Sequence, residues 1–147
     1  YTCVARMMGF VNNVVLPTIP TQAGRIVVDV SGDGIDNCAV RGTSDKERDL
    51  LIGAGVTING LPIIVKGEND IVGAGAYRAP GYGLDNLGPD TDTTTLDAWY
   101  EEHVIGGPGS FLKVAQGYED FGRAFRQKFV TEISGRPSSD TKQAEAR

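Results

Sequence analysis

The chain has 147 residues, 40% of them hydrophobic, and a formal net charge of −5. It contains no Lys/Arg-rich segment, which argues against a nucleic-acid partner, and no apolar run of the roughly 20 residues that span a bilayer. Length and composition therefore predict one modest domain with no membrane span.

The first half of the chain is predicted to form two helices and one strand, over residues 2–16, 44–52 and 25–30. In the first helix, Thr2 is a candidate N-cap, and Pro17 ends the helical pattern. Ser44 and Glu47 have the spacing of a capping box, which indicates the start of the second helix. The β-branched run at residues 25–30 is typical of a strand that is buried on both faces.

The second half is predicted to form two strands, at residues 56–63 and 111–115, and two helices, at residues 96–104 and 118–133. The last helix is amphipathic, because apolar residues recur at every fourth position, at Phe121, Phe125, Phe129 and Ile133. Residues 68–95 lack periodicity and form a long irregular insertion, and residues 136–147 form a polar, disordered tail. Strands alternating with helices predict a parallel, right-handed α/β sheet.

The first strand is followed directly by the polar loop Ser31-Gly32-Asp33-Gly34-Ile35-Asp36. Open α/β sheets bind their ligands at the carboxyl ends of strands, and oxygen ligands suit a hard divalent cation. The structural alternative is a helix-capping turn in which Asp33 or Asp36 accepts hydrogen bonds from backbone N–H groups. Asp29, inside the strand, is interpreted as structural.

The remaining reactive side chains give weaker indications. Cys3 and Cys38 are either two independent small residues or a disulfide, which would imply an oxidising compartment. The only histidine, His103, is interpreted as a surface residue, since the chain has no second histidine or cysteine pair for zinc. The glycine-rich segments lack the spacing of nucleotide-binding loops.

Several blocks resemble, in the right order, the bacterial domain-of-unknown-function 1194 family, and they lie at residues 28–34, 55–63, 96–100, 104–109 and 121–135. That family is similar to von Willebrand factor type A domains. The resemblance implies a Rossmann-like, doubly wound parallel sheet, of which residues 1–135 would be the C-terminal half, with strands four to six and their flanking helices. The N-terminal half would be on another chain or absent from this one, which would leave the strand at residues 25–30 as an exposed edge.

The resemblance also implies a metal-ion-dependent adhesion site at the carboxyl edge of the sheet, built from three loops. Asp33 matches the aspartate of the third loop, and Thr2 is a plausible match for the threonine of the second. The Asp-x-Ser-x-Ser first loop has no match, unless Asp29-x-Ser31-x-Asp33 is a variant of it. We expect Thr2, Ser31 and Asp33 to bind Mg²⁺, or Mn²⁺ or Ca²⁺, weakly in this chain.

These expectations favour a non-enzymatic module that binds a protein partner through the cation, with a carboxylate of the partner completing the metal shell. One alternative is a structural subunit whose metal site is vestigial. Another is a magnesium-dependent phosphoryl hydrolase using Asp33, although no nucleophile with a partnered acid or base is found and fold alone does not assign chemistry. The resemblance further implies a periplasmic or secreted location, because the family often carries export signals.

Overall fold

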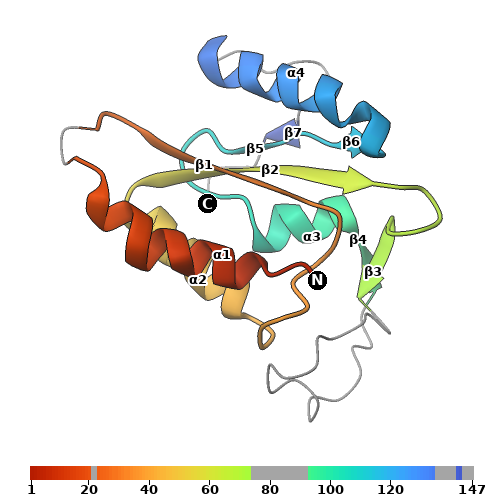
Figure 1. The fold of residues 1–147 in the computed structure, drawn as a ribbon, viewed down its shortest axis with the longest axis horizontal. Helices are drawn as coiled ribbons and strands as arrows, with labels where there is room; N and C mark the ends of the chain where they lie inside the picture. The colour runs from red at the N-terminus through yellow and green to blue at the C-terminus, as the bar shows by residue number, and fades with distance from the viewer. Residues whose placement is uncertain (21–22, 74–92, 135–141, 144–147) are drawn as a thin grey trace.

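The computed structural model describes residues 1–20, 23–73, 93–134 and 142–143. These residues form a mixed α/β structure around a central sheet, with α1, α2 and α3 on one face and α4 on the other (Figure 1). The prediction of a parallel sheet flanked by helices is confirmed. No helix among the described residues has the length and apolar character needed to cross a bilayer.

The sheet is organised around the long strand β2 (Val56–Ile64). β1 (Ile26–Gly32) runs parallel to β2 over its whole length. On the other side of β2 lie β5 (Phe111–Leu112) and β6 (Ala115–Gln116), both parallel to it. β7 (Lys142–Gln143) adds an antiparallel pairing to β5. Within the described ranges, β1 pairs with a strand on one flank only.

The predicted third strand is divided into β5 and β6, with Lys113 and Val114 between them. The division is local, because the backbone N–H of Lys113 still donates to the carbonyl of Gly60 at 2.9 Å. The chain therefore follows β2 along both short strands, and the predicted position of this third strand is confirmed.

The helices lie close to their predicted positions, and their bounds are α1 (Val4–Phe10), α2 (Thr43–Gly53), α3 (Leu96–His103) and α4 (Phe121–Ser134). The first continues into a π-helical turn, η1 (Val11–Val15), and a 3-10 turn, η2 (Leu16–Thr18). A further 3-10 turn, η3 (Tyr118–Asp120), precedes α4.

Two predicted N-caps are wrong. The N-cap of α1 is Cys3 rather than Thr2, and the Cys3 side chain makes no hydrogen bond to the helix. The N-cap of α2 is Gly42, whose φ of 82° suits glycine, so that Ser44 lies inside the helix. Glu47 instead accepts a hydrogen bond from Asn12 Nδ2 at 2.8 Å, which joins α2 to η1. The Glu47 side chain therefore makes a tertiary contact instead of the predicted capping box.

The hydrophobic core fills the space between the sheet and the three helices α1, α2 and α3, and its fully buried side chains include Met8, Leu51, Ile58, Leu96, Tyr100 and Leu112. Gly60 on β2 allows the close approach of its neighbours, because a Cβ there would lie 2.5 Å from Leu112 Cδ1 on β5 and 3.2 Å from Tyr100 Cδ1 on α3. α3 can consequently lie directly against the middle of β2.

The region predicted as an irregular insertion contains two short strands. β3 (Ile71–Gly73) and β4 (Thr93–Thr95) pair antiparallel, so the prediction is wrong at these two ends, where β-branched residues favour strands. Residues 74–92, and all of the predicted tail except the two residues of β7, lie outside the described ranges.

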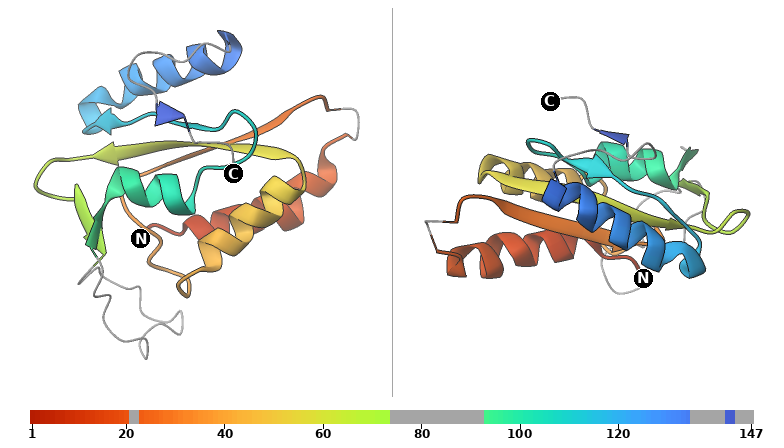
Figure 2. Two further views of the ribbon diagram at one scale, coloured as in Figure 1. Left: turned by 180° about the vertical axis from the view of Figure 1, so that it is seen from behind. Right: turned by 90° about the horizontal axis from the view of Figure 1, so that it is seen from above.

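Phe121 packs against the small cluster of Leu61, Ala115 and Ala124, but the rest of the apolar stripe of α4 is turned away from the sheet. Phe125, Phe129 and Ile133 are exposed by 48%, 53% and 74%, and the rings of Phe125 and Phe129 stack on each other. The buried side of the helix carries Ala124, Lys128 and Thr131. Figure 2 shows α4 on the opposite side of the sheet from α1 and α2.

α4 packs its polar side against a polar face of the sheet. On this face β1 presents Asp29, and β2 presents Asn59, which is fully buried. Lys128 forms ion pairs with Asp29 and, at 2.8 Å, with Glu132. Glu132 also accepts a hydrogen bond from Asn59 Nδ2 at 2.6 Å. Buried polar groups need partners, and this network supplies them, which is why the helix faces the sheet with its charges.

Candidate functional site

Thr2 is held beside the loop that follows β1, although the two segments are more than thirty residues apart. The backbone N–H of Thr2 donates to Asn37 Oδ1 at 3.0 Å, and the backbone N–H of Asn37 donates to the carbonyl of Thr2, also at 3.0 Å. The next residue, Cys3, forms a disulfide with Cys38, with 5.3 Å between the Cα atoms. Of the two alternatives for the cysteines, the disulfide is therefore the one found.

Asp36 acts as the cap of α1. Its carboxylate accepts hydrogen bonds from the backbone N–H of Ala5, in the first turn of the helix, and from the backbone N–H of Cys38 at 3.1 Å. A carboxylate at a helix N-terminus satisfies free N–H groups and interacts well with the helix dipole. The helix-capping alternative is therefore confirmed for Asp36.

Asp33 has a different environment at the exposed carboxyl end of β1. Its carboxylate accepts a hydrogen bond from the hydroxyl of Tyr118, and this bond raises the pKa of Tyr118. The carbonyl of Asp33 accepts a hydrogen bond from Asn69 Nδ2 at 2.6 Å. The loop is thus anchored from two sides, while the carboxylate itself stays at the surface.

Two glycines leave room for Thr2 next to Asp33. A Cβ on Gly34 would lie 3.0 Å from Thr2 Oγ1, and a Cβ on Gly32 would lie 3.7 Å from Thr2 Cγ2. The structure therefore brings the hydroxyl of Thr2 against the loop that carries Asp33. Side chains alternate along a strand, so Ser31 and Asp33, which flank Gly32, project from the opposite face, where Asp33 binds Tyr118.

The sequence reasoning missed Tyr100 as a member of this region. Tyr100 lies on α3 with 0% exposure, and a Cβ on Gly32 would lie 2.7 Å from its hydroxyl oxygen. Burial, and to a lesser degree the charge of Asp33, raises the pKa of Tyr100. The pair Leu96 and Tyr100 has the i, i+4 spacing of core residues, so the sequence indicated packing and gave no sign of a polar role.

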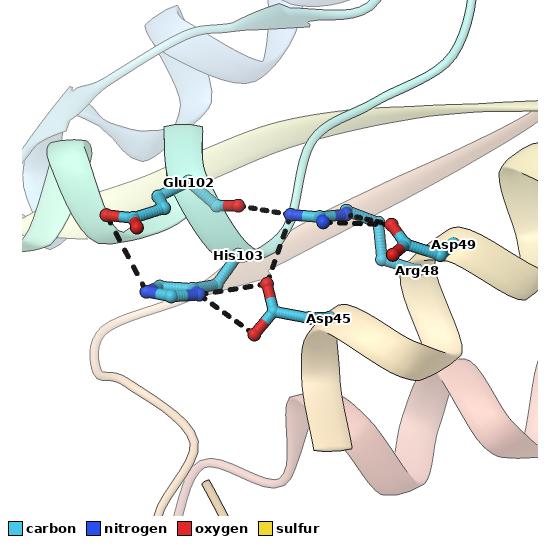
Figure 3. Close-up of polar contacts among 5 residues, drawn as sticks. All are labelled: Asp45, Arg48, Asp49, Glu102 and His103. Carbon is cyan, nitrogen blue, oxygen red and sulfur yellow. Dashed lines mark hydrogen bonds and ion pairs between the residues drawn. The ribbon is translucent and has the colours of Figure 1, made fainter. Parts of the chain in front are cut away.

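A second polar cluster joins α2 to α3 (Figure 3). His103 Nδ1 lies 3.0 Å from one carboxylate oxygen of Asp45, and Arg48 lies 3.2 Å from the same oxygen. The His103 side chain is 28% exposed, so it is a partly buried, paired residue rather than a simple surface histidine. The cluster borders a cleft of about 490 Å³ between residues 35–45, α3 and the β3–β4 pair.

Metal-binding groups are sparse in the described parts of the chain. No cluster of three or more His, Cys, Asp or Glu side chains there is suited to hold a metal ion. At the carboxyl end of β1 the described residues offer the carboxylate of Asp33, which already accepts a hydrogen bond from Tyr118, and the hydroxyls of Thr2 and Ser31. A donor set of one carboxylate with hydroxyls fits a weakly held, largely hydrated Mg²⁺ and does not fit zinc.

The parallel sheet with flanking helices makes this a mixed α/β protein whose arrangement is compatible with a Rossmann-like fold. A family comparison then identifies it more narrowly: the profile described as "Protein of unknown function (DUF1194)" matches residues 2–137, and the chain belongs to this family. Comparisons with curated proteins and with solved structures gave no match.

Proposed function

We propose that this chain is a non-enzymatic protein-binding module, similar to von Willebrand factor type A domains, that uses a divalent cation at the carboxyl end of β1. The observation that carries the proposal is the position of the Thr2 hydroxyl against the Asp33–Gly34 turn, where a Cβ on Gly34 would lie 3.0 Å from it. Hydroxyl and carboxylate donors from two separate segments are suited to a hard cation such as Mg²⁺ or Mn²⁺.

Asp33 would supply the only negative charge of the site, and Thr2 would supply a neutral oxygen. We propose Ser31 as a further neutral oxygen donor beside Asp33 and Thr2. The bound cation would supply a positive charge for a carboxylate of the partner protein. Since Mg²⁺ keeps several waters when protein ligands are few, exchange of a water for such a carboxylate is chemically reasonable.

A partner is also proposed along the free flank of β1. Parallel sheets normally have both faces covered by helices. The unpaired edge of such a sheet is a template for pairing with another strand. In the part of the chain that the structure describes, β1 pairs only with β2. We propose that the N-terminal half of a type A-like domain, supplied by a separate polypeptide or segment, pairs there.

A periplasmic or secreted location is proposed on the strength of the Cys3–Cys38 disulfide. Disulfides persist in oxidising compartments and are rare in the cytosol. Mass spectrometry of the protein from its native host, alkylated before and after reduction, would test this: two thiols reactive before reduction would argue against it.

Calorimetric titration of Mn²⁺ into the wild-type chain and into Asp33→Asn tests the cation site. Asparagine retains an acceptor for the Tyr118 hydroxyl but removes the charge, so we expect Mn²⁺ affinity to fall about tenfold or more. Asp49→Asn is the matched control, because this carboxylate is 64% exposed on α2. Absence of Mn²⁺ binding by the wild-type chain would favour the alternative of a structural subunit.

A further inference from the structure

Helix α4 has an outward face that no other element of the described residues covers (Figure 1). Its apolar members are Phe125, Phe129, Val130 and Ile133, which are exposed by 48%, 53%, 58% and 74%. Single exposed apolar side chains are ordinary, whereas a contiguous set on one helix is typical of an interaction surface. The fold does not account for this set, because α4 packs on the sheet through its opposite side.

The outward residues have the spacing of a helix-pairing seam. Gly122 and Phe129 are seven positions apart, and so are Arg126 and Ile133, which lie between and beyond them. Helices that pair side by side repeat their contact residues every seven positions in this way. All four residues of the seam are exposed, so a second helix could lie along the length of α4.

The seam is complementary to itself when two copies of α4 run antiparallel about a two-fold axis between residues 127 and 128. Gly122 of one copy then faces the large side chain of Ile133 of the other. A Cβ at Gly122 would meet no atom within 4 Å outside its own helix backbone, so this position offers open space. In the adjoining layer Arg126 faces the ring of Phe129, which is a favourable cation–π pair.

The charge on the seam selects this direction of pairing. The neighbouring cations Arg123 and Lys128 are held by Asp120 and Glu132, whereas no such carboxylate contact is found for Arg126 among the described residues. In a parallel pair the two copies of Arg126 would face each other, and like charges repel. The antiparallel pair separates them and gives each guanidinium an aromatic partner.

We propose that the outward face of α4 joins two copies of this chain into an antiparallel, two-fold symmetric homodimer. A two-fold contact uses the same patch on both subunits, as this seam does. One helix face is smaller than a standard interface, so we expect weak association, with a Kd above about 1 μM. The inference goes beyond the proposed cation site and is independent of it, because the contact uses neither Thr2 nor Asp33.

Sedimentation equilibrium of the wild-type chain from about 1 to 500 μM tests for pairing in the range of a weak Kd. Gly122→Leu is the decisive variant. We expect it to raise the Kd at least about tenfold, because its side chain collides with Ile133 of the other copy at two symmetric places. Leucine favours helix more than glycine, so the Tm of the dilute, monomeric variant should be unchanged or higher.

Phe129→Ser is the second variant, and Leu50→Ser is its matched control. The two side chains are exposed almost equally, by 53% and 52%, but Leu50 lies on α2. We expect Phe129→Ser to remain monomeric over the whole concentration range, because it removes the aromatic partner of Arg126 from both layers. Leu50→Ser should pair as the wild type does.

Three results would overturn the proposal. The first is a wild-type chain that stays monomeric at the highest concentration; if that chain also bound vesicles of phosphatidylcholine and phosphatidylserine, the face would be assigned to a lipid surface instead. The second is pairing that Gly122→Leu leaves unchanged or strengthens, as expected for nonspecific apolar association. The third is a loss of pairing in Leu50→Ser as large as in Phe129→Ser.

Discussion

Lys128 brings a positive charge into the contact between α4 and the sheet. Its side chain is 2% exposed and lies between the carboxylates of Asp29 and Glu132, with the ring of Phe111 5.7 Å from its Nζ. A buried charge is tolerated only when it is paired and hydrogen-bonded, and here both carboxylates depend on the same ammonium group. The sequence placed Lys128 on a helix but could not identify its partners, which come from residues far apart in the chain.

Lys128→Met should therefore destabilise the protein by about 3 kcal/mol, the typical cost of removing one partner from a buried ion pair. The methionine retains most of the volume but leaves Asp29 and Glu132 without a cation. Denaturant unfolding followed by circular dichroism measures the effect. Arg126→Met on the exposed side of the same helix is the control, and its change should stay within about 0.5 kcal/mol. Equal stabilities for the two variants would contradict the network.

Asp120 gives the protein a modest acid sensitivity. Its hydrogen bonds from Arg123, and then from the backbone N–H of Gln116 at 2.8 Å, lower its pKa to about 2. An unfolded aspartate titrates near about 3.9, so the stabilisation is present above that pH and is lost as the pH falls toward 2. Arg123 is 48% exposed, so we expect less than about 1 kcal/mol at pH 7.

The prediction is checked by unfolding wild type and Asp120→Asn at pH 7 and at pH 2.5. The stability difference between the two proteins should shrink at the lower pH, where the wild-type carboxylate is partly protonated. A difference that grows on acidification would contradict the prediction. Glu119→Gln, at the neighbouring position in η3, is the control for a general effect of charge.

At the scale of elements, α4 shows where the sequence was sufficient and where it was not. The spacing of Phe121, Phe125, Phe129 and Ile133 predicted the helix, and the helix is present over residues 121–134. Periodicity could not say which way the stripe faces, because that depends on the opposing surface. The sheet presents polar groups such as Asn59 there, so the polar side of the helix packs inward.

Substitution of the outward stripe should consequently leave the fold intact. Phe129→Ser changes a side chain that is 53% exposed, and we expect a stability change within about 0.5 kcal/mol. Ala124→Leu, on the buried side of the same helix, should cost about 1–3 kcal/mol through overpacking. Chemical unfolding of the two variants decides the matter: a larger loss for Phe129→Ser than for Ala124→Leu would show that the stripe is packed.

The disulfide ties the start of α1 to the loop after β1. It joins two residues that are 35 positions apart in the sequence. By the chain-entropy estimate, closing a loop of this length adds about 3–4 kcal/mol to the free energy of unfolding. The double variant Cys3→Ser, Cys38→Ser should lose that stability in denaturant unfolding and should also bind Mn²⁺ more weakly, because Thr2 loses its covalent neighbour. Reductant should mimic the variant in the wild type and leave the variant unaffected; any other pattern would argue against the crosslink.

At the scale of the whole molecule, the sequence predicted the class of sheet but only part of its detail. Alternating strands and helices were sufficient for parallel pairing of β1, β2 and β5. The antiparallel β3–β4 pair escaped detection because three-residue strands carry too little periodicity. Likewise, the family resemblance suggested Thr2 as a neighbour of the loop after β1, while the hydroxyl of Tyr100, unpaired among the described residues, depends on contacts that only a folded structure reveals.

Hydrogen exchange should expose the asymmetry between the edge and the centre of this sheet. In the isolated chain, amides of β2 should be protected along the strand, since strands lie on both sides of it. Amides of β1 that point to its free flank should exchange quickly, alternating with protected ones that face β2. Full protection of β1 would contradict the free edge, and a doubled mass in solution would then identify a second copy as its cover.

The Cys3–Cys38 disulfide and the two Thr2–Asn37 hydrogen bonds would lower the entropy cost of binding at the proposed cation site. Closing a long loop around an ion would ordinarily weaken binding, because the ends of the loop must give up their freedom. Here the two segments are already joined in the folded protein, so the proposed site would be preorganised before a cation binds. The oxidation state of two sulfur atoms would thereby govern how tightly this edge of the molecule can retain a cation.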